Sequence, residues 1–241
     1  MKLNVMGNKL HFRELNEQVR TSKDSEIVLE NCIGQRYIGS GLSGKHLTIY
    51  GTPGNALGAY LNGATITVYG NAQDAAGDTM NAGGIYIHGS IGDAAGYAMR
   101  GGKIMVEGNA GYRAGIHMKA YREKLPVLII GGCAGSFLGE YQAGGLIVVL
   151  GIGCEGVPVG NFCSTGMHGG KVFVRSSEPV KHLPPQVEIR QAEEQDLKEI
   201  ESYLKEFCQE FQKDFQTLMK KEFWVISSAT HNPYQQLYTA N

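Results

Sequence analysis

A glycine-containing unit repeats every 19 residues through the central part of this chain. Residues 70–89 read GNAQDAAGDTMNAGGIYIHG, and residues 89–108 read GSIGDAAGYAMRGGKIMVEG. Apolar positions keep the same phase as the glycines, so equivalent side chains form rows, called ladders below. A fixed period with aligned side chains indicates stacked, equivalent structural units. One glycine ladder comprises Gly39, Gly58, Gly77, Gly96 and Gly115.

Each unit contains one short segment in which apolar residues alternate with others, as in 66–68, 85–87 and 104–106. A period of two places the apolar side chains on one face of a strand. Glycine is too frequent in the rest of the unit for a helix. We therefore predict an all-β fold, a right-handed parallel β-helix of about seven coils. Aliphatic, alanine and methionine ladders fill its interior, and glycines with positive φ form its corners.

The two ends of the chain depart from the repeat. Residues 10–20 predict a short helical cap, and residues 193–220 carry apolar side chains at the three- and four-residue spacing of an amphipathic helix. This helix is expected to pack on its own chain, with docking on another subunit as the alternative. The stretch from Phe223 onward is interpreted as an irregular, extended arm on the surface. Three regions result: an N-terminal cap (1–25), a glycine-repeat β-helix (26–176) and a C-terminal helix with a tail (177–241).

The period fails at two insertions. AYREKLP at 120–126 predicts a protruding loop, and a second insertion lies within 151–163, before the last strand. These breaks are the first places to look for a partner. An outward row of Tyr50, Tyr69 and Tyr86 is a second predicted contact face, because tyrosine is enriched in interfaces.

The 22 basic and 23 acidic residues give a net charge of −1, so nothing in the charge favours nucleic acid or a membrane as a partner. No apolar run has the length of a signal peptide or of a membrane span. The five cysteines are odd in number and widely spaced. The chain is therefore expected to be cytoplasmic, with reduced thiols.

Two glycine patterns imitate nucleotide sites. GSGLSGKH at 39–46 lacks the hydroxyl residue of a phosphate-binding loop and precedes a strand rather than a helix. GIGCEG at 151–156 has no βαβ unit around it. Both are interpreted as corners of the repeat.

Titratable residues show no catalytic spacing either. Cys154 and Cys163, with His168 nearby, lack metal-binding spacing, and the two cysteines are interpreted as small buried residues of a ladder. Asp74 and Asp93 occupy equivalent positions and are interpreted as solvated corners. His88 and His117 have no nucleophile or carboxylate at a fixed offset. We therefore predict no catalytic, cofactor-binding or metal-binding residue in this chain.

GQRYIGSGLSG at 34–44 and NFCSTGMHGGKVFV at 161–174 resemble the C-terminal GXGXG β-helix domain of the glutamate synthase large chain. LNEQVR near the N-terminus and Phe223-Trp-Val-Ile near the C-terminus are similar to that family too. The tail helix around 207–217 departs from the family pattern. The GMHGGK wording is also similar to the C subunit of formylmethanofuran dehydrogenase. The glycines expected to be structural are Gly39, Gly58, Gly77, Gly96, Gly115, Gly166, Gly169 and Gly170.

In both families the β-helix is a scaffold, so the resemblance implies a non-catalytic structural subunit of a glutamate-synthase-like complex. Its implied partners are glutamine amidotransferase and flavin synthase subunits, which would carry the FMN and the iron–sulfur cluster. The implied process is glutamate biosynthesis. The alternative is a β-helix subunit of a formylmethanofuran dehydrogenase-type molybdenum or tungsten enzyme. A self-contained carbohydrate-binding β-helix is a third, less favoured hypothesis, and self-association stays open.

Overall fold

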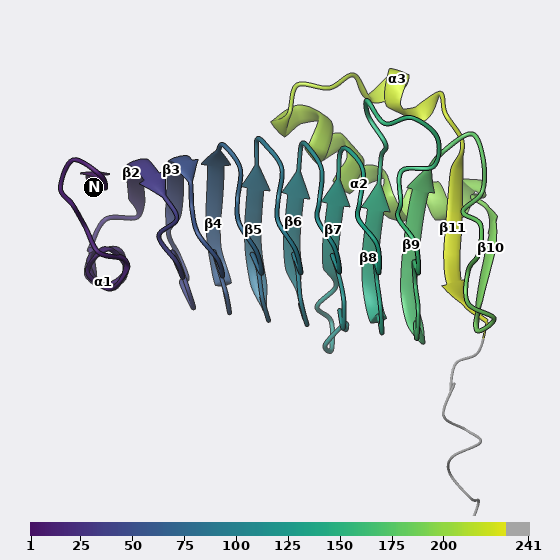
Figure 1. Ribbon diagram of the computed structural model, residues 1–241, viewed down its shortest axis with the longest axis horizontal. Coiled ribbons are helices and arrows are strands. Elements are labelled where there is room, and N and C mark those ends of the chain that lie inside the picture. Colours follow the sequence, from purple (N-terminus) through teal and green to yellow (C-terminus); the bar gives the residue numbers. More distant parts are fainter. Residues whose placement is uncertain (230–241) are drawn as a thin grey trace, which may run out of the picture.

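The computed structural model describes residues 1–229, and one eleven-stranded mixed sheet dominates it (Figure 1). The strand order is β1-β2-β3-β4-β5-β6-β7-β8-β9-β11-β10. The strands are β1 (Lys2–Asn4), β2 (Glu26–Ile33), β3 (His46–Thr52), β4 (Asn62–Tyr69), β5 (Ala82–Ile87), β6 (Gly102–Val106), β7 (Pro126–Ile130), β8 (Ala143–Val149), β9 (Gly169–Arg175), β10 (Val187–Gln191) and β11 (Phe223–Ser228). The helices are α1 (Phe12–Thr21), α2 (Glu194–Glu210) and α3 (Phe215–Met219). The fold is therefore all-β-like with few helices.

Strands β2 to β9 pair in parallel, each with the next along the chain, as the repeat predicts. Equivalent residues of successive units face one another; Leu47 pairs with Ile66, Ile66 with Ile85, and Ile85 with Ile104. A second line of parallel bridges joins Ala72, Ile91, Ala110, Ala134 and Val159. The chain therefore returns to the same two lines once in every unit, and Figure 1 shows the strands side by side along the long axis.

The corners of the units explain where glycine is needed. Gly58 has φ +61°, and a Cβ placed there would lie 2.7 Å from the Ile85 Cδ1 atom of the next unit. Non-glycine residues with positive φ flank it at Ala56 and Tyr60. The N–H of Gly58 donates to the preceding unit at Ile38 O, whereas those of Ala56 and Tyr60 donate to the following unit. Each corner is thus hydrogen-bonded to the units on both sides of it.

The core has two parts, one on the inward face of the sheet and one beneath α2. The inner core contains the predicted aliphatic, alanine and methionine ladders, including Ile66, Ala76 and Met80. The outer core forms where α2 crosses the outward face of the second half of the sheet. Burial of apolar surface there holds the helix in place. Its members are Met105, Val127, Ile129, Leu146, Val148, Leu150, Phe173, Ile200, Leu204, Phe207, Cys208, Phe211, Leu218, Phe223 and Val225. The amphipathic helix therefore packs on its own chain.

The C-terminal region differs from the sequence-based expectation in two places. The predicted helix over 193–220 is broken, because the chain leaves α2 after Glu210 and Gln212 takes φ +53° before α3 begins. The segment Phe223–Ser228 was expected to be irregular, but it is strand β11, antiparallel to both β9 and β10. Val225 and Ile226 are buried on opposite sides of that strand, which gives it a reason to insert. The rest of the predicted arm, 230–241, lies outside the described residues.

Candidate functional site

Polar side chains at the corners of the repeat units accept hydrogen bonds from backbone N–H groups of the next unit. The Asp74 carboxylate accepts the N–H of Asp93 at 2.9 Å, and the Asp93 carboxylate accepts that of Tyr112 at 2.8 Å. Asn71 and Ser90 do the same for Ser90 and Asn109 in a neighbouring ladder. Each side chain therefore caps the next unit, a role that the sequence analysis missed. An Asp, Asn or Ser recurring at one phase of the repeat was the available signal.

Charged and hydroxyl groups also attach α2 to the sheet. Glu206 accepts hydrogen bonds from the Tyr86 hydroxyl at 2.6 Å and from Lys103 Nζ at 2.7 Å. Burial, reinforced by Glu206, raises the pKa of Tyr86. Tyr86 is therefore covered by α2, which corrects its placement in an outward contact row. Tyr50 and Tyr69 stay 45% exposed and stack with ring centroids 5.1 Å apart.

The end of α2 bounds a polar pocket of about 490 Å³. His88 Nε2 lies 3.0 Å from a Glu210 carboxylate oxygen, and the His88 ring stacks on Tyr69. Lys213 pairs with Glu107 at 2.7 Å on the same rim. The imidazole and both carboxylates thus contact partners within the fold, and no Ser, Cys, Thr or Lys side chain is among the residues that line this pocket.

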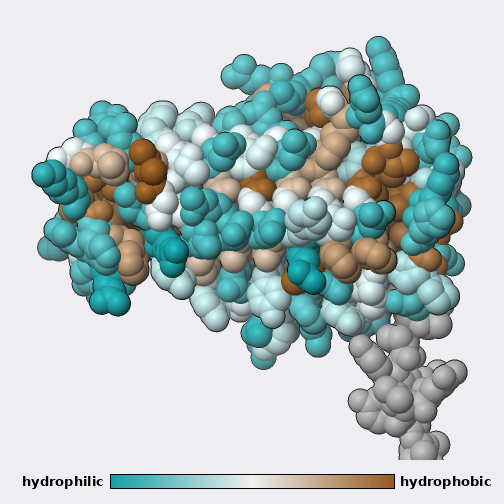
Figure 2. All heavy atoms as spheres, viewed as in Figure 1, coloured by the Kyte–Doolittle hydropathy of each residue, from teal (hydrophilic) through white to brown (hydrophobic). Residues whose placement is uncertain are grey.

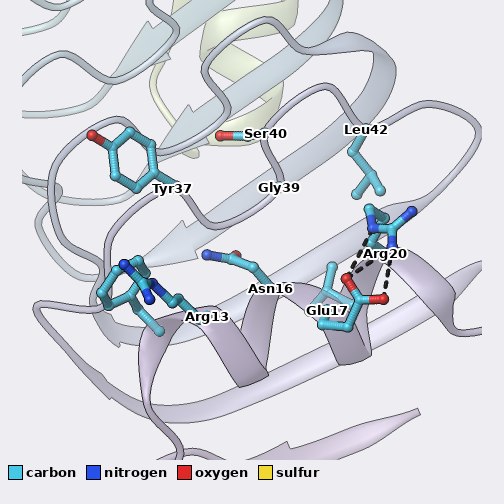
Figure 3. Close-up of a pocket in the computed structure, with 10 residues that line it drawn as sticks. Arg13, Asn16, Glu17, Arg20, Tyr37, Gly39, Ser40 and Leu42 are labelled. Atoms are coloured by element: carbon cyan, nitrogen blue, oxygen red, sulfur yellow. Dashed lines mark hydrogen bonds and ion pairs between the residues drawn. The ribbon is translucent and has the colours of Figure 1, made fainter.

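A pocket of about 290 Å³ separates α1 from the first corner, where the sequence resembled a phosphate-binding loop. Figure 3 shows Tyr37 and Ser40 of the corner facing Arg13 and Asn16 of α1. The Lys45 ammonium group is not free to bind a phosphate, because its Nζ donates to the carbonyl oxygens of Val19, Arg20 and Ser22 at the end of α1. The lysine of the motif therefore caps a helix.

The second nucleotide-like segment holds a disulfide bond. Cys133 and Cys154 are bonded, with their Cα atoms 6.1 Å apart. The expectation that all thiols are reduced is therefore wrong for this pair. The two residues are separated by 21 positions, and the insertion beginning near Gly151 brings the second cysteine beside the first on adjacent units. His168 lies apart from them, with its Nδ1 3.1 Å from Gly166 O.

The remaining cysteines, Cys32, Cys163 and Cys208, are buried. Burial raises the pKa of Cys32 to about 12 and that of Cys163 to about 11, so both are protonated at neutral pH. Within residues 1–229, no three His, Cys, Asp or Glu side chains are grouped to hold a metal ion. In the same residues, no helix combines the length and apolar character needed to cross a membrane.

A pocket of about 320 Å³ opens beside the first insertion and is lined by Ala98, Arg100, His117, Lys119 and Tyr121. We call it the cationic pocket. His117 stacks on Tyr141 with ring centroids 5.2 Å apart, and Tyr97 meets the His117 ring edge-on. Neither Arg100 nor Lys119 has a carboxylate within ion-pair distance among the described residues. This site is suited to binding an anionic group.

The glycines singled out from the sequence lie at two kinds of position. Those of the main ladder follow one corner of the coil with φ between +61° and +72°. Gly166 and Gly170 belong to the last unit and also have positive φ, while a Cβ on Gly169 would lie 2.6 Å from Ala143 O. None of these glycines lines the cationic pocket.

Comparison with known proteins places these observations in a family. The family model described as the GXGXG motif matches residues 14–229. An uncharacterized protein of Methanocaldococcus jannaschii is 44% identical over 249 aligned residues, which cover 98% of this chain and 95% of that protein. The crystal structure of the formyltransferase/hydrolase complex from Methylorubrum extorquens with methylofuran contains a similar fold. The TM-score is 0.61 at 22% identity, with 84% of this chain and 73% of that one covered. The chain belongs to the GXGXG-motif family.

Proposed function

We propose that this chain is a non-catalytic structural subunit of a multi-subunit enzyme complex. The observation that carries the proposal is that side chains able to perform chemistry contact the fold itself. His88 contacts Glu210, Asp74 and Asp93 cap backbone, and Lys45 caps α1. Polar groups used in this way hold the stack together, and no Ser, Cys, Thr or Lys side chain lines the pocket beside His88 as a nucleophile for it to activate.

The stack is well suited to this role. We interpret the paired strands and the second line of bridges as a right-handed parallel β-helix of about seven coils. Residues 1–25 and 177–241 would be its two end regions. Strand β1 pairs with β2 at one end, and β11 pairs with β9 at the other, so both end regions continue the sheet. A continuous sheet keeps surfaces at its two ends at a fixed separation.

Two kinds of complex are candidates. Family membership favours a glutamate-synthase-like assembly in the cytoplasm. Glutamine amidotransferase and flavin synthase subunits would then carry the FMN and the iron–sulfur cluster. The likeness to a chain of a formyltransferase/hydrolase complex favours a formylmethanofuran dehydrogenase-type enzyme as the second candidate. A self-contained carbohydrate-binding β-helix is less favoured, because α2 covers the outward face of strands β6 to β9.

Purification of a tagged copy of the chain from its own cells tests the proposal. We expect other subunits to co-purify in fixed ratio. Flavin would identify the first kind of complex, and molybdenum or tungsten the second. Co-expression with the genes that neighbour its own gene is the complementary arm. A chain that stays alone in both arms would contradict a structural-subunit role.

The exposed pair Tyr50 and Tyr69 gives a more local test. Tyr69→Glu is expected to weaken assembly without unfolding the chain, because the side chain is 45% exposed and lies beside α2. Tyr112→Glu, at an exposed corner, is the matched control. A sizing-column profile of the complex that is the same for both variants would remove this face from the proposal.

A further inference from the structure

The cationic residues beside the first insertion are concentrated at one place in the repeat. Arg100 and Lys119 follow the buried Met99 and Met118, and both are exposed. Their N–H groups donate to Met80 O and Met99 O, in register on adjacent units. Successive units of the stack lie about 4.8 Å apart, so the two cations belong to neighbouring units of one row, just outside the strands.

The same row carries no charge in the units before this point. The equivalent residues there are Ser43, Asn62 and Asn81. The lysine and arginine therefore appear only in the two units next to the insertion. No ion pair neutralises either cation among the described residues, so both charges are available to a group that approaches from outside.

The insertion itself adds two more cations. Tyr121 and Lys124 exchange backbone hydrogen bonds at 3.1 Å, which folds 121–124 into a tight turn. A Cβ placed on Gly101 would lie 2.9 Å from Lys124 Cβ, so the turn packs against the residue next to Arg100. Arg122 lies over the Tyr121 ring at 5.2 Å. Arg100, Lys119, Arg122 and Lys124 form what we call the cationic surface, in which Glu123 is the one acidic neighbour along the chain.

The neighbouring acids contact other groups. Glu140 lies 3.5 Å from Arg113, and Asp78 accepts a hydrogen bond from the Thr79 hydroxyl. The rim is aromatic, since Tyr97, Tyr121 and Tyr141 are 39–49% exposed. Arginine and tyrosine are enriched in protein interfaces, where arginine recognises carboxylates. Figure 2 shows that hydrophilic side chains cover much of the middle of one face, while larger hydrophobic patches lie toward its two ends.

We propose that the cationic surface docks a carboxylate-rich, acidic segment of a partner subunit, with the cationic pocket receiving one of its side chains. The protruding turn and the tyrosine rim favour a protein partner over a small anion. This inference rests on the proposed function, because it supposes a complex, and it adds where and by what chemistry a partner attaches.

The test uses the tagged chain in its own cells, with the double variant R100E/K119E. We expect recovery of at least one partner subunit to fall by about tenfold or more at unchanged Tm, because like charges across an interface oppose association. Asn62→Glu places a negative charge in the same row, two units before Arg100 and away from the insertion, and is expected to leave recovery unchanged. In the intact complex, Lys119 and Lys124 are expected to be protected from acetylation, and exposed in the isolated chain.

A second arm uses the purified chain with a synthetic glutamate-rich peptide and with inorganic phosphate as probes. Peptide binding that weakens with added salt and is lost in R100E/K119E supports the proposal. Phosphate binding without peptide binding overturns it in favour of a small-anion site. Equal partner recovery with R100E/K119E and wild type overturns this inference and leaves the proposed function standing. A wild-type chain that recovers no partner contradicts the proposed function. Peptide binding by the purified chain then decides on its own whether the cationic surface binds an acidic segment.

Discussion

Arg190 holds the Asp196 carboxylate with both terminal guanidinium nitrogens, at 2.6 and 3.0 Å. The same carboxylate accepts the N–H of Glu193 at the start of α2 and lies 3.3 Å from Lys171 Nζ. Asp196 is 4% exposed. One buried side chain therefore joins strands β9 and β10 to the first turn of the helix that covers the outer core.

This contact predicts a pH-dependent contribution to stability. The hydrogen bonds from Arg190 lower the pKa of Asp196 to about 2 from its usual value of 3.8. Because the carboxylate binds its proton less readily in the folded state, its ionised form stabilises the fold above pH 3.8. This stabilisation is lost as the pH falls toward 2 and the carboxylate becomes protonated. Asp196→Asn is expected to lower the free energy of unfolding by about 1–2 kcal/mol at pH 7, and by less at pH 3. Urea denaturation at both pH values measures it.

Glu201→Gln is the control for Asp196→Asn. Glu201 also lies on α2 and pairs with Lys205, but the two side chains are 43% and 59% exposed. An exposed pair contributes about 0–1 kcal/mol, so this variant is expected to be nearly neutral. An Asp196→Asn deficit that does not change between pH 7 and pH 3 would assign the effect to packing rather than to charge.

Phe207 anchors α2 in the outer core, where it is fully buried. Phe207→Ala is expected to cost about 3–5 kcal/mol, because it removes a large apolar side chain and leaves a cavity. Denaturant unfolding and hydrogen exchange in α2 measure the loss. Phe162→Ala is the matched control, since Phe162 is 59% exposed, and it is expected to cost less than about 1 kcal/mol. Equal costs would contradict the docking of α2 described above.

Gly58 and Gly44 separate backbone conformation from crowding. Their φ values are +61° and +60°, but only Gly58 has Ile85 Cδ1 within 2.7 Å of an added Cβ, while Gly44 has open space. Gly44→Ala is expected to cost about 1–2 kcal/mol for the left-handed conformation. Gly58→Ala is expected to cost about 1–3 kcal/mol more, from overpacking. The change in Tm of each variant separates the cost of the backbone conformation from the cost of crowding. Equal changes in Tm would show that the Ile85 side chain moves aside without cost.

The disulfide predicts a simple count. The denatured, unreduced chain is expected to take up three alkyl groups, on Cys32, Cys163 and Cys208, and the reduced chain five. Intact mass after alkylation measures this number. Five groups without reductant would restore the expectation of free thiols throughout.

The repeat was enough to predict the strands and their register. Ile66 and Ile85 are 19 positions apart and face each other, because each unit stacks on an equivalent one. The position of α2 was also predictable from its apolar spacing. The break at Gln212 was not, since its apolar residues continue the helical spacing into α3.

Other features depend on contacts between segments that the period does not relate. Strand β11 pairs with β9, and the paired residues Phe223 and Arg175 are 48 positions apart. The local sequence of β11 does not indicate which strand it pairs with. The disulfide depends on how an insertion displaces Cys154 within its unit. The cationic pocket was indicated only indirectly, as a break in the period, because its chemistry comes from aligned residues on two units and a turn.

The alternating hydrogen bonds at the corners, which reach both the unit before and the unit after, have a consequence for length. The corner of each internal unit makes the same backbone hydrogen bonds to the unit before it and to the unit after it. One unit can therefore pair with any other in place of its own neighbour. Removing residues 70–88, one full period, should let Gly51 and its neighbours meet the following unit directly. The two ends would then move together by about 4.8 Å. The number of repeat units thus sets the distance between partners bound at the two ends of the stack, in steps of one strand spacing.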